Sequence, residues 1–349
     1  MQAVHTAETR PTTTDHWQTL YRQAITDPEA LLQALDLPAD LLPAARRASA
    51  LFPLRVPQGF LARMQRGDPD DPLLRQILPL TDENMAIPGF QADPVGDMQA
   101  MPIPGVLHKY HGRVLLIMTG GCAINCRYCF RRHFPYAEAQ LSQRQWHQAL
   151  AYLREATDVN EVILSGGDPL LLPDGKLGQR LRDLEQIPHL SRLRIHSRLP
   201  VVLPERVTPA FIELLSGSRL QSVLVLHANH ARELDTSVAD AMAKLRGTGL
   251  TLLNQAVLLR GVNDTTEAQI ALSEQLFRIG VLPYYLHMLD PVDGAAHFNV
   301  TATVAVELLQ AVRERLPGYL VPTLVREDPG APSKTPQALR VNEAGVSLY

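Results

Sequence analysis

The chain contains three cysteines, and all of them lie within eight residues of one another. Cys122, Cys126 and Cys129 have the spacing C-x3-C-x2-C. A small, odd and clustered set does not form a disulfide framework, whereas thiolates this close together suit a soft metal centre. An iron–sulfur cubane takes one cysteine for each of its four irons, so three cysteines would leave one iron open to a small ligand. We therefore expect a [4Fe–4S] cluster that takes part in chemistry.

Two other interpretations of the cysteines remain open from the residues alone. His133 could complete a Cys3His zinc site, or the thiols could pack as small apolar side chains. A second motif, residues 164–170, contains Gly166, Gly167 and Asp168. Without Cβ atoms, the two glycines would let the backbone approach a ligand closely, although an ordinary turn between a strand and a helix would also explain them.

The chain has only four lysines, which limits the candidates for Schiff-base chemistry. Lys176 and Lys244 lie in patterns typical of solvated surface residues, while Lys109 remains a candidate. Lys334 lies in a loop rich in proline and glycine, residues 328–336, which could reach across the open face of a barrel. A solvated lysine in a flexible tail is the competing interpretation.

The elements that must position these residues follow a repeating pattern after about residue 100. Apolar runs that predict strands occupy residues 114–118, 161–165, 193–196, 223–226, 251–258 and 281–288. They alternate with amphipathic stretches, and most successive starts lie near 30 residues apart, which is typical of βαβ units and a parallel sheet. A doubly wound sheet and a barrel both satisfy this pattern, but polar residues follow most of the runs and favour a barrel, whose active sites lie at that rim.

The first hundred residues predict short helices, one of them opened by Asp27-Pro28. Residues 69–104 predict an irregular connection over the surface of the next unit. We expect a helical N-terminal region at 1–100, a barrel at 101–300 and a C-terminal segment carrying Lys334 at 301–349.

Composition narrows the function classes. The formal charge of −3 provides no bulk positive field for nucleic acid or an anionic membrane. No apolar run approaches a membrane span, and residues 1–11 carry charged side chains in place of a signal peptide. We expect a cytoplasmic protein.

Taken together, several stretches resemble the lysine 2,3-aminomutases, which are radical S-adenosylmethionine (SAM) enzymes that also carry pyridoxal 5′-phosphate (PLP). The similarity spans about residues 50–340 and rests on residues 113–132, 164–170, 194–198, 254–264 and 283–290. The similarity is closer still to the bacterial EpmB branch, which acts in the (R)-β-lysylation of elongation factor P. It rests there on residues 70–76, 129–136 and 332–336.

The resemblance implies which residues bind the cofactors. The cluster ligands would be Cys122, Cys126 and Cys129, and the SAM contacts would be Gly166, Gly167 and Asp168. Lys334 would hold PLP as an aldimine, and Arg113 would contact the PLP phosphate.

The resemblance also implies how the substrate is held. Arg131 would bind the substrate carboxylate through a bidentate guanidinium, while Asp290 and Glu327 would hold the ε-ammonium of lysine. The larger aminomutases have Asp at the position of Glu327 and a glycine run before the PLP lysine. They also extend further than the fifteen residues that follow Lys334 here.

The resemblance thus implies a partial (β/α)6 TIM-like barrel and an isomerase that converts L-α-lysine to (R)-β-lysine. A β-lysine ligase would then attach the product to elongation factor P, and self-association remains open. One rival is a radical SAM and PLP aminomutase for another amino acid, such as glutamate or arginine. The other is a non-enzymatic, zinc-binding interaction protein.

Overall fold

The structure is a computed structural model that describes residues 16–139, 141–342 and 345–348. The expectation for residues 1–11 lies outside the described residues. In the main sheet of the structure, neighbouring strands are consecutive in the chain. They are β1 (Val106–Tyr110), β2 (Arg113–Thr119), β3 (Glu161–Gly166), β4 (Arg192–Ser197), β5 (Gln221–His227), β6 (Thr251–Val257), β7 (Leu282–His287), β8 (Thr323–Arg326) and β9 (Thr335–Pro336). The strands from β2 to β8 pair in parallel, and β1 and β9 add antiparallel edges.

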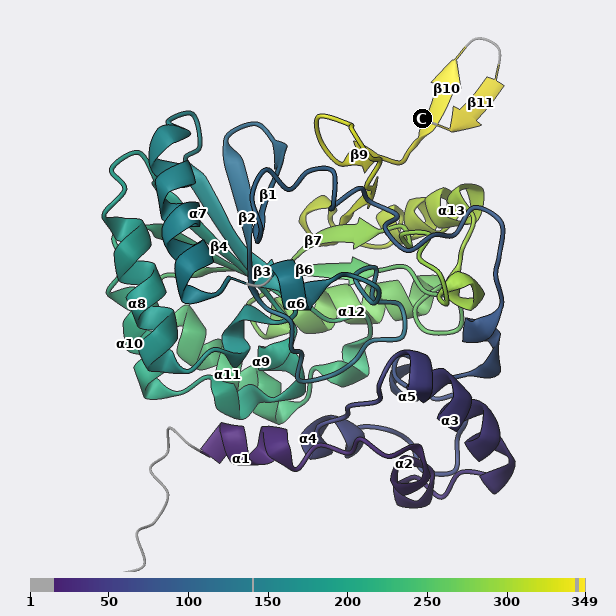
Figure 1. Cartoon of the computed structure of the whole chain (residues 1–349). Helices are drawn as coiled ribbons and strands as arrows, with labels where there is room; N and C mark the ends of the chain where they lie inside the picture. The colour runs from purple at the N-terminus through teal and green to yellow at the C-terminus, as the bar shows by residue number, and fades with distance from the viewer. Residues whose placement is uncertain (1–15, 140, 343–344, 349) are drawn as a thin grey trace, which may run out of the picture.

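This topology confirms the expected fold class. All six predicted strands are present, as β2 to β7, and the sheet curves into a partial barrel flanked by helices (Figure 1). The sheet also contains a seventh parallel strand, β8, which has only two buried residues, Leu324 and Val325. Such a short apolar run carries no periodic signal, so the sequence did not predict it. The proposed division at residues 100 and 300 stays a prediction.

Helices follow the strands and also form the region before the barrel. That region contains α1 (His16–Arg22), α2 (Pro28–Ala34), α3 (Leu42–Leu51), α4 (Gln58–Leu61) and α5 (Pro72–Arg75). The barrel helices are α6 (Tyr136–Ala139), α7 (Gln143–Glu155), α8 (Asp174–Glu185), α9 (Leu199–Val202), α10 (Pro209–Ser216), α11 (Thr236–Arg246), α12 (Thr266–Arg278) and α13 (Ala302–Arg313). A hairpin of β10 (Leu339–Asn342) and β11 (Gly345–Leu348) ends the described chain, outside the barrel (Figure 1).

Local sequence signals explain where several helices begin and end. Asp27 caps α2, and its carboxylate accepts hydrogen bonds from the Glu29 and Ala30 amides. Thr208 caps α10 in the same way, with Pro following it at the first helical position. Past the ends of α11 and α12, Gly249 and Gly280 have φ of +77° and +81°, a conformation that favours glycine. The helix that Asp27-Pro28 was expected to open is confirmed.

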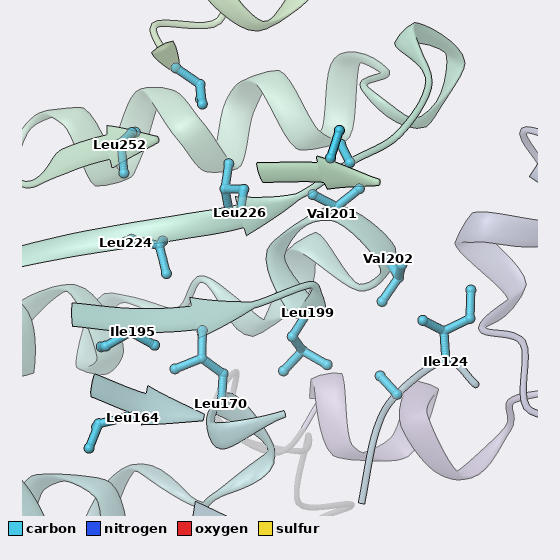
Figure 2. Close-up of a cluster of buried hydrophobic side chains, with 14 of the residues drawn as sticks. Ile124, Leu164, Leu170, Ile195, Leu199, Val201, Val202, Leu224, Leu226 and Leu252 are labelled. Carbon is cyan, nitrogen blue, oxygen red and sulfur yellow. The ribbon is translucent and has the colours of Figure 1, made fainter. Parts of the chain in front are cut away.

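The main core lies between the sheet and the helices. Figure 2 shows Leu164, Ile195, Leu224 and Leu252 from neighbouring strands. Ile124 belongs to the same core and is only 3% exposed. Because burying a residue of this size contributes about 1.5–3 kcal/mol, Ile124 anchors the loop that carries the cysteines.

The helices before the barrel pack on the loops that follow β4 and β5. From the end of α4, Arg63 donates hydrogen bonds from Nη1 to the carbonyl oxygens of Val201 (2.6 Å) and Glu233 (2.8 Å). Its Nε also pairs with Asp235 at 3.0 Å. These contacts place the N-terminal region over the carboxyl ends of the strands. No helix among the described residues is long and apolar enough to cross a membrane.

Candidate active site

One cavity lies at the carboxyl ends of the parallel strands and collects almost all the predicted site residues. Those that line it are Cys122, Cys126, Cys129, Arg131, Gly166, Gly167, Asp168, Asp290, Glu327 and Lys334. They come from the loops after β2, β3, β7 and β8 and from the segment that leads into β9. Arg113 does not line this cavity; it lies at the opposite end of β2, where its guanidinium stacks on Tyr110 at 4.6 Å.

The cysteine loop follows β2 directly. Its thiols lie close enough to influence one another, since burial and then the Cys126 sulfur raise the pKa of Cys129 to about 11. Burial likewise raises the pKa of Cys122. Thiols with raised pKa values keep their protons at neutral pH, but they bind metal as thiolates. Loading a metal centre here would therefore release protons.

The arrangement distinguishes a cluster from a single ion. Among the described residues, no group of three or more Cys, His, Asp or Glu is placed to hold one metal ion. His133 lies elsewhere, with Nε2 at 3.3 Å from the carbonyl oxygen of Asp293, and it does not line the cavity with the cysteines. The zinc interpretation therefore loses its fourth ligand. A cubane binds each thiolate through a different iron, so three thiols around one cavity fit it.

The turn with two glycines packs directly against the cysteine loop. The Gly167 amide donates to the Thr119 carbonyl at 2.7 Å, and the Asp168 amide donates to the Gly121 carbonyl at 2.8 Å. A Cβ on Gly167 would lie 2.2 Å from the Gly121 carbonyl oxygen, and Gly166 has φ of +118°. The glycines are thus required by the contact between two loops, while their predicted contact with SAM stays a prediction.

Asp168 organises the loop after β4. Its carboxylate accepts hydrogen bonds from the Ser197 hydroxyl at 2.7 Å and from the amides of Arg198 and Leu199, both at 2.9 Å. A fourth donor is the Leu170 amide at 3.0 Å. Burial raises the pKa of this carboxyl. Because these protein donors already surround it, the structure gives Asp168 a positioning contact with β4.

A chain of largely buried ion pairs connects three residues that line the cavity, Arg131, Glu327 and Lys334. Arg131 Nε pairs with Asp97 at 2.6 Å, and Asp97 also pairs with Lys109 Nζ at 2.6 Å. Lys109 then pairs with Glu327 at 2.9 Å, and Glu327 with Lys334 Nζ at 2.5 Å. Burial alone would raise the pKa of Glu327, but Lys334 and Lys109 outweigh it and bring the value to about 2.

Asp290 is the least compensated carboxylate in the cavity. Its Oδ1 atom is buried and has no hydrogen-bond partner within the described structure. Burial, followed by repulsion from Glu327, raises the pKa of Asp290 to about 7. An isolated buried carboxylate of this kind is suited to receive a cation.

Three histidines line the floor of the cavity: His196, His227 and His287. Burial lowers the pKa of each, and that of His227 falls to about 3. They are therefore neutral at pH 7 and add no charge that would repel a cationic ligand.

Sequence reasoning missed Asp97 and Lys109 as a linked pair. Residues 69–104 were expected to form an irregular connection over the surface of the next unit, and that expectation stays a prediction. Within this segment Asp97 is 1% exposed and pairs with two cations of the site, Arg131 and Lys109. Lys109, which the sequence left as a candidate without a role, was the signal that could have pointed to this pair.

Comparison with known proteins agrees with this geometry. The family described as "Radical SAM superfamily" matches residues 116–271. Over 330 residues, the chain is 52% identical to L-lysine 2,3-aminomutase from Escherichia coli (strain K12), covering 94% of this chain and 96% of that protein. The chain belongs to the lysine 2,3-aminomutase family. It is also 48% identical over 320 residues to the Haemophilus influenzae protein of the same name, covering 92% and 95% of the two chains.

Membership of the lysine 2,3-aminomutase family makes the chain a radical SAM enzyme, and aminomutases are isomerases. The radical SAM family implies a [4Fe–4S] cluster and SAM, which the three thiols and the open cavity fit. Among solved structures, a radical SAM methyltransferase from Sphaerobacter thermophilus shares 18% identity at a TM-score of 0.46, covering 63% of this chain and 68% of that one.

Proposed function

We propose that the protein converts L-α-lysine to (R)-β-lysine, with Cys122, Cys126 and Cys129 as the cluster ligands. One observation carries the proposal: the three thiols share their cavity with Lys334, with the buried Arg131 and with two acidic residues. This set offers a place for a cluster, an amine for PLP and a contact for each charged end of lysine.

Each charged end of lysine would bind side chains of the opposite charge. Arg131 is 8% exposed; Asp97 fixes its Nε, and its Nη1 donates to the Ser165 hydroxyl at 3.3 Å, which leaves Nη2 to bind a carboxylate. Asp290 and Glu327 supply negative charge for the ε-ammonium. A substrate that lacks this amine would leave Asp290 buried without a cation, which is the basis of the proposed specificity.

PLP is proposed as the second cofactor because Lys334 projects into the cavity from an irregular segment. Its ε-amino group would hold PLP, and the family resemblance assigns the phosphate to Arg113. Gly166, Gly167 and Asp168 would line the SAM site. When bound, the cluster and SAM supply a radical that removes hydrogen from the substrate, and PLP carries the nitrogen that migrates.

The remaining task of the chain is placement and shielding. A radical reacts with whatever lies nearest, so the substrate must be held within contact distance of it and water must be kept out. The ion-pair chain from Arg131 to Lys334 holds both substrate contacts in one connected structure. The neutral histidines form a floor that donates no proton at pH 7.

We place the product in the modification of elongation factor P, through a β-lysine ligase. Support comes from the resemblance of residues 70–76, 129–136 and 332–336 to the branch with that role. Deleting the gene should remove the β-lysyl group from the factor, as measured by mass spectrometry. An unchanged mass would contradict this part of the proposal. We also propose a cytoplasmic location and a division of the chain into regions 1–100, 101–300 and 301–349.

The reaction itself is tested by anaerobic turnover of reconstituted protein with SAM, dithionite, PLP and L-lysine, with β-lysine measured by chromatography. Wild type and Lys176→Ala, which changes an exposed lysine on α8, should both form β-lysine. Lys334→Ala should form none and should lack the absorbance of bound PLP. SAM cleavage without β-lysine in the wild type would refute lysine as the substrate and direct attention to glutamate and arginine.

A further inference from the structure

Arg198, directly after β4, contacts the cysteine loop and lines the same cavity. Its Nη1 atom lies 2.7 Å from Cys126 Sγ and 2.6 Å from the Tyr128 hydroxyl. The side chain is 6% exposed. No role in the proposed reaction uses this arginine.

The guanidinium is fixed from several directions. Nη2 donates to Gln76 Oε1 at 2.7 Å and pairs with Glu233 Oε2 at 2.9 Å. Glu233 is itself fully buried, and its other oxygen accepts hydrogen bonds from the Asn229 and His230 amides at 2.9 and 3.1 Å. Arg198 therefore cannot turn away from Cys126 without breaking several buried contacts.

We propose that Arg198 sets the reduction potential of the cluster by donating a charged hydrogen bond to the Cys126 sulfur. Reduction adds one electron, and hence one negative charge, to a cluster whose thiolates already carry negative charge. A fixed cation and an N–H donor at one sulfur stabilise the reduced state more than the oxidised state. The potential is therefore more positive than it would be without Arg198.

Glu233 has the opposite effect in this arrangement. Its carboxylate partly cancels the charge of Arg198, and both are shielded from water, so the field at the cluster depends on the pair. Removing the arginine charge should lower the potential, whereas removing the glutamate charge should raise it. A role in folding alone does not predict opposite directions.

The inference rests on the proposed cluster at the three cysteines, so iron content and the spectrum of the reduced wild type are measured first. A wild type without a [4Fe–4S] signal would overturn the proposed function itself. With the cluster present, the midpoint potential is measured by redox titration followed by electron paramagnetic resonance, without SAM or substrate.

Three variants decide the inference. Arg198→Met should shift the midpoint potential to a more negative value, and Glu233→Gln to a more positive one. Arg63→Met is the matched control because Arg63 is equally buried, at 6%, yet pairs with Asp235 and backbone carbonyls; its potential should equal that of the wild type. An unchanged potential in Arg198→Met, or shifts in the same direction in both test variants, would overturn the inference. If Arg198→Met binds no cluster, Glu233→Gln decides alone, and anything other than a more positive potential counts against it.

Discussion

Replacing Asp290 with asparagine should stabilise the substrate-free protein above neutral pH while weakening its contact with lysine. The carboxyl has a pKa of about 7 in the folded protein, against an ordinary value of 3.8. Between these values the folded state keeps a proton that the unfolded chain releases. The free energy of unfolding therefore falls as pH rises from about 4 to about 7.

The size of the effect follows from the difference between the two pKa values. Each pH unit between them corresponds to about 1.4 kcal/mol, so ionising this one buried group costs up to about 4 kcal/mol of stability at pH 8. Asparagine carries no charge, but it leaves the same position without a hydrogen-bond partner. We therefore expect Asp290→Asn to gain about 2 to 4 kcal/mol at pH 8 and much less at pH 4.

Urea unfolding followed by circular dichroism at pH 4, 6 and 8 would measure this difference. Asp293→Asn provides the control, since it removes a carboxylate three residues away on the same loop. Adding L-lysine at pH 8 should stabilise the wild type more than Asp290→Asn, because the ε-ammonium supplies the missing cation. Equal pH dependence in wild type and Asp290→Asn would refute the assignment of Asp290 as an uncompensated buried carboxylate.

Three further outcomes are expected. Gly167→Ala should lower the iron content and the melting temperature, because the added Cβ meets a backbone carbonyl, whereas Gly175→Ala, with open space around its Cβ, should leave both unchanged. Asp97→Asn should weaken lysine binding in calorimetry by about tenfold or more, since Arg131 loses a charged partner worth roughly 1.5–3 kcal/mol; unchanged affinity would contradict this role. Norleucine, which lacks the ε-amine, should be turned over far more slowly than lysine, and equal rates would refute the proposed contact with Asp290.

The strands of the barrel could be predicted because their signals are local. Each of β2 to β7 has its own apolar run, and the repeat near 30 residues indicates parallel strands joined by helices. The cysteine spacing and the glycine turn are likewise contained in short segments. The sequence did not show why the glycines are required, because the atom that excludes a side chain at Gly167 is the carbonyl oxygen of Gly121 on another loop.

The long-range part of the site could not be read from local patterns. Asp97, Lys109 and Glu327 come from segments separated by up to 230 positions, and only the closed barrel brings them together. Glu327 was identified through resemblance, and its position depends on β8, the strand that the sequence did not reveal. Buried ion pairs of this kind depend on the desolvation of both partners, a property that a linear pattern does not encode.

The charges of the cavity explain why a cationic substrate belongs there. Three carboxylates face three cations: Asp97, Asp290 and Glu327 against Arg131, Lys109 and Lys334. In the structure the ammonium of Lys334 lies against Glu327, next to Asp290, where the ε-ammonium of lysine is proposed to bind. If the nitrogen of Lys334 holds PLP, it can no longer pair with Glu327 as a free ammonium, and Lys109 would be the remaining lysine partner of Glu327. Asp290 and Glu327 would then gain from an arriving ammonium, so we expect bound PLP to favour binding of the lysine ε-ammonium beside them.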